Sequence, residues 1–214
     1  KQQLAYLFQD LKEQESILEL NRQLQADMIR KHHEDRVSQL ENYRKLKTSE
    51  QQVEHLIGQF NARIELERTT ETEKLASKAM NLGMFAHLKG KLPMPVLVGK
   101  VVSAFGRGFD PKSRLFIFKK GVDIATVKGA EVRAISAGKI AYSGELPEYG
   151  RVAIVDHGER FFSLCAHLGE LKKKAGDPVK AGDLIGLTDE SGTPVYFEIR
   201  ARNVAVNPLQ WVSN

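Results

Sequence analysis

The feature that most constrains this sequence is the uneven placement of its proline and glycine residues. All seven prolines lie at or beyond Pro93, and only three of the 17 glycines precede it. Because proline breaks helices and glycine marks turns, the first part of the chain favours long helices, and the rest favours short elements joined by turns. The sequence therefore predicts two structurally different parts that meet near residue 92.

In the first part, apolar residues recur at the spacing of a helix. From Leu46 to Ile64 these residues are spaced by seven, four, three and four positions. This spacing forms a heptad-like seam flanked by charged and amide side chains. The seam includes Leu4, Leu7, Leu11 and Leu18, and then Leu46, Val53, Ile57, Phe60 and Ile64. A seam of this length needs a partner, so we predict a coiled-coil segment over residues 1–64. The partner would be a helix of another chain or of an upstream segment.

Residues 65–92 predict a second, shorter amphipathic helix. Threonine and glutamate residues at 70–73 form a plausible capped start, and Gly90 and Pro93 end the pattern. Its apolar stripe consists of Leu75, Ala79, Leu82, Phe85 and Leu88. The stripe must be buried, and the nearest body is the domain that follows. We therefore expect this segment to be a regulatory or linker helix.

From Pro93 onward, short alternating runs are separated by glycine, which is typical of β-strands and turns. The runs cover residues 96–105, 132–135, 139–143, 151–156, 160–168, 183–188 and 195–200. They predict a mostly antiparallel β domain over residues 93–214. Together with the helices, this domain gives an α+β fold class.

Composition excludes some classes of protein. With 42% hydrophobic and 28% charged residues, the chain has no apolar run near the roughly 18 residues of a membrane span. Its net charge of +5 is compatible with binding to anionic surfaces such as a bacterial wall. The basic residues do not form a stripe interleaved with aromatic residues, which would be typical of a nucleic-acid-binding protein.

The single cysteine, Cys165, lies in an apolar run and is expected to be buried. Any secretion signal is expected upstream of Lys1, where the chain starts inside a helical pattern.

Several short motifs in the second part occur in an order typical of one family. They are 119–124, 129–134, 149–150, 155–158, 166–168, 176–179, 196–200 and 206–208. Together they resemble the LytM domain of the lysostaphin-type zinc endopeptidases over about residues 97–212. The resemblance implies that fold and, in active members, a catalytic zinc ion.

The resemblance also implies where zinc ligands would lie. Active members use a His-x-x-x-Asp motif and the second histidine of a late His-x-His motif, while two further histidines assist the zinc-bound water. The corresponding positions here are Lys119 and Asp123, then Pro194 and Tyr196, with His167 as the remaining helper histidine. A lysine places a cation near the dication, and proline offers no donor. We therefore predict no catalytic residue, no metal and no cofactor in a degenerate domain that is not an enzyme.

A LytM domain of this kind behind a long coiled coil resembles the EnvC-like murein hydrolase activators. That resemblance implies a periplasmic activator of N-acetylmuramoyl-L-alanine amidases in cell division, engaged through its coiled coil by the FtsE–FtsX complex. It also implies self-inhibition by the helix that precedes the LytM domain. The predicted partner-binding groove consists of Lys119, Lys120, Asp123, Tyr149, His167, Tyr196 and Arg200. Aromatic and arginine side chains are frequent at the energetic centres of interfaces.

Two alternatives remain open from the sequence. The chain could be an active zinc-dependent peptidoglycan endopeptidase with divergent ligands, or a structural coiled-coil scaffold whose β domain binds peptidoglycan. Paired carboxylates for sugar cleavage, Asp123 and Glu198, are less favoured because Glu198 belongs to a strand motif that the resemblance already explains. Peptidoglycan itself is a second candidate partner.

Overall fold

The structure, a computed structural model, describes residues 2–68, 84–110 and 114–213. It divides into two compact units, which are Lys1–Arg44 with Pro111–Leu115, and Lys45–Asp110 with Phe116–Asn214. Every candidate groove residue belongs to the second unit, and so does the last part of the long helix. The contacts within that unit therefore decide how the candidate site is built.

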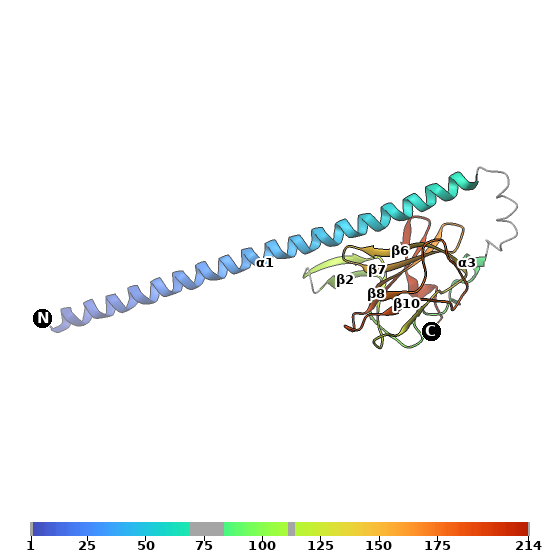
Figure 1. The fold of residues 1–214 in the computed structure, drawn as a ribbon. Coiled ribbons are helices and arrows are strands. Elements are labelled where there is room, and N and C mark those ends of the chain that lie inside the picture. The colour runs from blue at the N-terminus through green and yellow to red at the C-terminus, as the bar shows by residue number, and fades with distance from the viewer. Residues whose placement is uncertain (1, 69–83, 111–113, 214) are drawn as a thin grey trace. The chain divides into compact units, whose positions relative to one another are not determined.

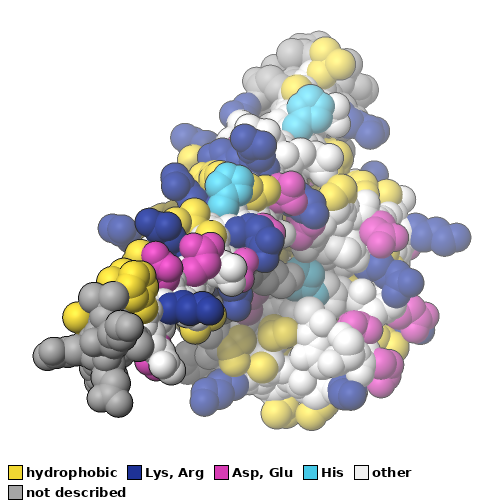
Figure 2. All heavy atoms as spheres, turned by 90° about the vertical axis from the view of Figure 1, so that its left-hand side faces the viewer, with side chains coloured by type: hydrophobic (Ala, Val, Ile, Leu, Met, Phe, Trp, Pro, Cys, Tyr) yellow, Lys and Arg dark blue, Asp and Glu magenta, His cyan; other side chains and the backbone are white. Residues whose placement is uncertain are grey.

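The chain begins with one long helix, α1, which spans Gln2–Arg68. A long N-terminal helix is thus confirmed, whereas its pairing as a coiled coil stays a prediction. In the first unit its apolar side chains are exposed, for example Leu11, Leu24 and Met28. Figure 2, seen from the side of the helix N-terminus, shows apolar side chains interspersed with basic and acidic ones. Across the described ranges, no helix is long and apolar enough to cross a membrane.

The second part of the chain is a mostly antiparallel β domain, as predicted. The strands of its ten-stranded sheet are β1 (Lys100–Ser103), β4 (Val122–Ala125), β5 (Glu131–Arg133), β6 (Gly138–Leu146), β7 (Gly150–Asp156), β8 (Phe161–Leu171), β9 (Pro178–Val179), β10 (Leu184–Thr188), β11 (Val195–Ala201) and β12 (Val204–Val206). The main path through the sheet is β1-β4-β11-β8-β7-β6-β9. Figure 1 labels β6, β7, β8 and β10 of this sheet. Strand β12 pairs with β11, and β10 pairs with both β5 and β8.

Three smaller elements complete the domain. Strands β2 (Gly106–Asp110) and β3 (Leu115–Lys119) form a separate two-stranded sheet. Helix α3 (Met84–His87) precedes the sheet, and the 3-10 helix η1 (Pro208–Gln210) follows it. The Phe85 ring of α3 stacks on the ring of Trp211 after η1, with 5.4 Å between centroids. This contact ties the entry and the exit of the domain together.

Strand β11 separates two hydrophobic clusters because successive residues of a strand point to opposite faces. Val195, Phe197 and Ile199 have no exposed surface and belong to the larger cluster. Tyr196 lies on the other face and packs against the smaller cluster. Both faces of β11 are therefore covered, and the candidate site lies on the Tyr196 side.

Candidate functional site

The sheet brings together the positions that correspond to a zinc site. On β11, Tyr196 is in register with Asp123 of β4 and with Ala166 of β8, the residue before His167. The rings of Tyr196 and His167 lie 6.3 Å apart, measured between centroids. Lys119 ends β3 and reaches Asp123. Strand pairing thus gathers residues that are far apart in the sequence.

Lys119 and Asp123 form a half-buried ion pair. The Lys119 Nζ lies 3.3 Å from Asp123 Oδ2 and also donates a hydrogen bond to Ser103 Oγ at 2.7 Å. The two side chains are only 18% and 24% exposed. The ammonium group therefore already neutralises the carboxylate, and it would repel a divalent cation placed beside it.

His167 is held between two backbone carbonyl groups. Its Nδ1 lies 3.2 Å from the Pro194 oxygen, and its Nε2 lies 3.2 Å from the Glu148 oxygen. The residue has a φ of 59°, a left-handed conformation that is uncommon outside glycine. Both ring nitrogens thus lie close to a backbone carbonyl, and a neutral ring donates to one of the two, at a backbone position that the fold has to enforce.

This donor set does not fit a catalytic zinc ion, which is normally held by three protein ligands with a position left for water. Only Asp123 and His167 carry ordinary zinc donors, and each is engaged as described above. Burial raises the pKa of the Tyr196 hydroxyl well above its usual value, which disfavours the phenolate that a metal would need. In the described part of the chain, no group of three or more His, Cys, Asp or Glu side chains could hold a metal.

The polar side chains of β11 form a buried network on the Tyr196 side. The Tyr196 hydroxyl donates to Glu198 Oε2 at 2.7 Å, and Arg200 Nε lies 2.5 Å from Glu198 Oε1. Glu198 has no exposed surface, and Arg200 is 2% exposed. Burial raises the pKa of the Glu198 carboxyl because the loss of hydration outweighs the favourable charge of Arg200. Glu198 and Arg200 are therefore enclosed in this conformation, and Tyr196 is half-buried beside them.

The element that encloses them is the last part of α1. The apolar surface around Tyr196, here called the Tyr196 face, consists of Tyr149, Val152, Ile154, Phe162, Leu164, Ala166 and Tyr196. Val53 and Ile57 of α1 pack on this face and are 0% and 1% exposed, with Phe60 and Ile64 partly buried beside them. A second helix was the predicted partner of this seam, whereas here residues 53–64 pack on the sheet. A sheet face offers the same apolar surface that a second helix would.

Polar contacts fix the edges of this helix. The Lys120 Nζ lies 2.6 Å from Glu54 Oε1 and 3.4 Å from Glu50 Oε2. Further along, the Asn61 amide donates to Asn203 Oδ1 after β11. The hydrogen bond from Lys120 is the main reason why the pKa of Glu54 is lowered. Glu50, Glu54 and Asn61 were not predicted as contact residues, because the local sequence pattern does not indicate their partners.

Replacing Glu54 with glutamine should lower the free energy of unfolding by about 0.5 kcal/mol at low salt and by less at high salt, because the pair is partly exposed. The pKa of Glu54 is depressed in the folded state, so its contribution is present above the ordinary value of 4.5 and is lost as the pH falls through the lowered value. Urea denaturation at two salt concentrations measures this, with Glu41→Gln on the exposed helix surface as the control. Equal losses in both variants would contradict a specific contact with Lys120.

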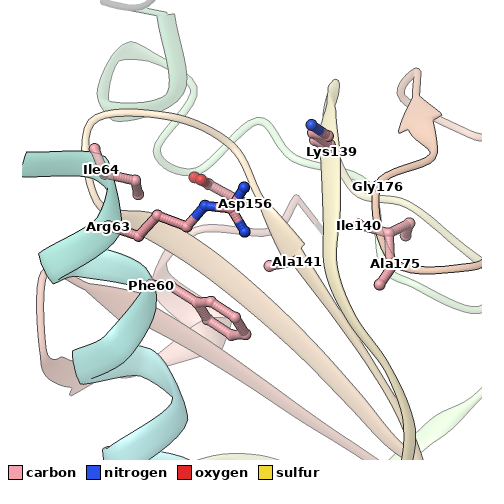
Figure 3. A pocket seen from close by; sticks show the side chains of 9 residues that line it. All are labelled: Phe60, Arg63, Ile64, Lys139, Ile140, Ala141, Asp156, Ala175 and Gly176. Atoms are coloured by element: carbon pink, nitrogen blue, oxygen red, sulfur yellow. The ribbon is translucent and has the colours of Figure 1, made fainter. Parts of the chain in front are cut away.

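The cover leaves a cavity of about 290 Å³ at its C-terminal end. It lies between Phe60, Arg63 and Ile64 of α1 and residues of β6 and β7. Figure 3 shows the Arg63 side chain reaching from the helix towards Asp156 at the end of β7, with the Phe60 ring beneath it. Packing between α1 and the sheet is therefore looser at the end of the helix than around Val53 and Ile57.

The predicted regulatory stripe is described only in part. Leu75, Ala79 and Leu82 lie outside the described residues. Phe85 is 4% exposed and stacks on the His157 ring at 4.6 Å, and Leu88 packs against the same larger cluster. Since that cluster contains the opposite side of β11, the two residues do not contact the Tyr196 face. Among the described residues, α1 is the segment that covers it.

Known proteins support the domain assignment. The family model for Peptidase family M23 matches residues 117–208. Over 118 residues the chain is 35% identical to the murein hydrolase activator NlpD of Escherichia coli (strain K12). The match covers 53% of this chain and 29% of NlpD. Over 150 residues it is 33% identical to the murein hydrolase activator EnvC of the same organism. That match covers 68% of this chain and 34% of EnvC. The chain thus spans about a third of the length of these relatives.

A solved structure supports the same fold. Csd3 of Helicobacter pylori is similar with a TM-score of 0.51 and 26% sequence identity. The match covers 57% of this chain and 35% of Csd3. The strand order and the sequence motifs therefore lead to the same type of domain.

Proposed function

We propose, from the premise that residues 117–208 form a peptidase family M23 (LytM) domain, that this chain is a non-catalytic activator of murein hydrolases. The hydrolases would be N-acetylmuramoyl-L-alanine amidases that split peptidoglycan in the periplasm during cell division. Support comes from two relatives named murein hydrolase activator, at 35% and 33% identity. The chemistry of the site supports the same function.

A non-catalytic role is supported by the groups that stand where a zinc site would be. The Lys119 ammonium pairs with Asp123, and the Tyr196 hydroxyl donates a hydrogen bond to Glu198. Because no residue set in the described part of the chain fits a metal, these side chains can instead hold and orient a protein partner. Lys120, Tyr149, Tyr196 and Arg200 remain our proposed contacts for the amidase.

The observation that carries the proposal is the burial of Val53 and Ile57 on the Tyr196 face. A helix tethered to its own domain competes with any partner at high effective concentration. We propose that residues 49–64 block the amidase-binding surface until they are displaced, so that the chain inhibits itself. The exposed apolar residues nearer the N-terminus of α1, such as Leu11, Leu24 and Met28, would receive the FtsE–FtsX complex that displaces residues 49–64.

The proposed function assigns a separate role to each of three segments of the chain. Residues 1–64 would receive the division signal and carry the inhibitory cover. Residues 65–92 would act as the linker or regulatory segment, and residues 93–214 would bind the amidase. The division follows the composition change at Pro93 and the contacts of α1 within the second unit.

The proposal is tested by dye release from labelled peptidoglycan. The amidase alone, the chain alone and the mixture are compared, together with a mixture that contains a chain whose helix cover is disrupted. We expect release only when the amidase is present, and strong stimulation only when the cover is disrupted. Release by the chain alone would instead support a peptidase, and no stimulation by a folded, uncovered chain would overturn the activator function.

Restoring zinc ligands should restore metal binding. The double variant Lys119→His/Tyr196→His adds two imidazoles beside Asp123, which makes three protein ligands of the kind that a catalytic zinc needs. After dialysis against zinc, elemental analysis should find about one ion per variant chain and far less on the unmodified chain. The control Lys119→Gln/Tyr196→Gln removes the same native groups without adding an imidazole. Stoichiometric zinc on the unmodified chain would contradict the degenerate site.

A further inference from the structure

The two-stranded sheet of β2 and β3 exposes an aromatic surface that the proposed function does not use. Phe109, Phe116 and Phe118 are 51%, 68% and 57% exposed. The residues Phe116 and Phe118 lie two apart and so share one face of β3. The Phe116 ring contacts that of Phe109 on β2 at 5.6 Å between centroids, and the Phe118 ring contacts that of Phe105, just before β2, at 5.3 Å. We call these four phenylalanines the aromatic face.

The aromatic face is not explained by folding. Only Phe105 packs against the larger hydrophobic cluster, where it anchors the hairpin to the domain. The other three rings are each more than half exposed: Phe109 and Phe116 contact each other, and Phe118 contacts Phe105. A two-stranded ribbon gains little stability of its own. Exposed apolar surface gathered on one face is typical of a site for a protein or a membrane.

The polar chemistry beside the aromatic face is cationic. The Arg107 guanidinium lies 5.7 Å from the centre of the Phe116 ring and is exposed to solvent. Among the described residues between Gly106 and Phe118, Arg107 and Arg114 are basic and Asp110 is acidic. Cations next to exposed apolar side chains match a surface that is anionic outside and apolar beneath.

Two other partners fit these observations less well. The ring pairs meet edge to face, at interplanar angles of 83° and 65°, so neighbouring rings do not form a flat platform for stacking sugars. Protein interfaces usually carry about one hydrogen bond per 100–200 Å². Of the five residues that make up the aromatic face and its cation, Arg107 is the one whose side chain can form hydrogen bonds, and its guanidinium offers donors but no acceptor.

We infer that the aromatic face docks onto an anionic lipid bilayer. Phe109, Phe116 and Phe118 enter the boundary between headgroups and acyl chains, where water no longer contacts their rings. Arg107 stays at the level of the lipid phosphates and holds the hairpin by charge. This contact is separate from the Tyr196 face, so either proposal can fail without the other.

Vesicle cosedimentation of the full chain tests this inference. We expect binding to phosphatidylcholine vesicles that contain about a third phosphatidylglycerol, and weaker binding as the salt concentration rises. Phe116→Ser/Phe118→Ser should lower the partition coefficient about tenfold or more. Arg107→Gln should lower binding to the anionic vesicles and leave weak binding to pure phosphatidylcholine unchanged. Val204→Ser, at a residue that is 66% exposed on β12, is the matched control and should bind like the unmodified chain.

Circular dichroism verifies that each variant is folded, and Phe109→Ser provides a second aromatic variant if the double variant is not. Equal partition of the aromatic variants and the unmodified chain would overturn the inference. So would a failure of the unmodified chain to bind any vesicle. Binding to purified peptidoglycan in place of vesicles, lost in the same aromatic variants, would assign the face to the wall and also overturn it.

Discussion

Ile57→Asp should stimulate the partner amidase about tenfold or more above the level given by the unmodified chain. Ile57 is 1% exposed, and the substitution puts a carboxylate against the apolar Tyr196 face. Burying that charge costs several kcal/mol, whereas about 1.4 kcal/mol already shifts an equilibrium tenfold. The helix should therefore leave the face while the β domain stays folded. Dye release from labelled peptidoglycan measures the gain.

The matched control for this experiment is Ala62→Asp. It adds the same charge to the same helix, five residues away and on the exposed side. We expect stimulation equal to that of the unmodified chain. If both variants stimulate equally, charge on the helix is sufficient and the covered face is not the cause. If Ile57→Asp exposes Tyr149 and Tyr196 to solvent without any stimulation, self-inhibition by α1 is wrong.

Arg200→Met should lower the free energy of unfolding by about 3–5 kcal/mol at neutral pH. Arg200 is 2% exposed and pairs with the fully buried Glu198 at 2.5 Å, so its removal leaves a buried carboxylate without a counter-ion. The double variant Glu198→Gln/Arg200→Met removes both charges and should lose less than Arg200→Met alone. Urea denaturation measures all three proteins. Arg202→Met, on an exposed arginine two residues further on, should change little.

The pH dependence of this loss has a defined sign. Burial already raises the pKa of Glu198 above its ordinary 4.5, and without Arg200 it should rise further. A carboxyl with a raised pKa in the folded state keeps its full contribution below 4.5 and loses it as the pH rises through the folded pKa. The cost of Arg200→Met should therefore be larger at about pH 8 than at about pH 5. A cost that does not change with pH would mean that Glu198 is not left charged and buried.

Much of the fold follows from patterns that are local in the sequence. The long helix is predicted by a stretch free of proline, and most sheet strands by alternating runs between glycines. The hairpin of β2 and β3 is not predicted, because its alternation of Phe116 and Phe118 with Leu115 and Ile117 is apolar on both sides. A run without polar contrast carries little information about which face is buried.

The candidate site, too, can be predicted in part from the sequence. The residues that replace the zinc ligands can be identified from motif order. Strand pairing then brings Asp123 and Tyr196 together, and Lys119 reaches Asp123 from four residues before it. The contacts that α1 makes with the site could not be predicted. Glu54 of α1 lies 66 positions before Lys120, and no rule of spacing connects residues so far apart.

The sequence alone determined that α1 has an apolar seam, because residues three and four apart share a side of any helix. It also determined that β11 presents Tyr196, Glu198 and Arg200 on one side, because a strand alternates. Only the tertiary structure decided that residues 53–64 of the seam and the Tyr196 face cover each other. Hydrophobic burial has no direction, so a seam can pack on any apolar surface of suitable shape, and its choice depends on which surface the rest of the fold brings within reach.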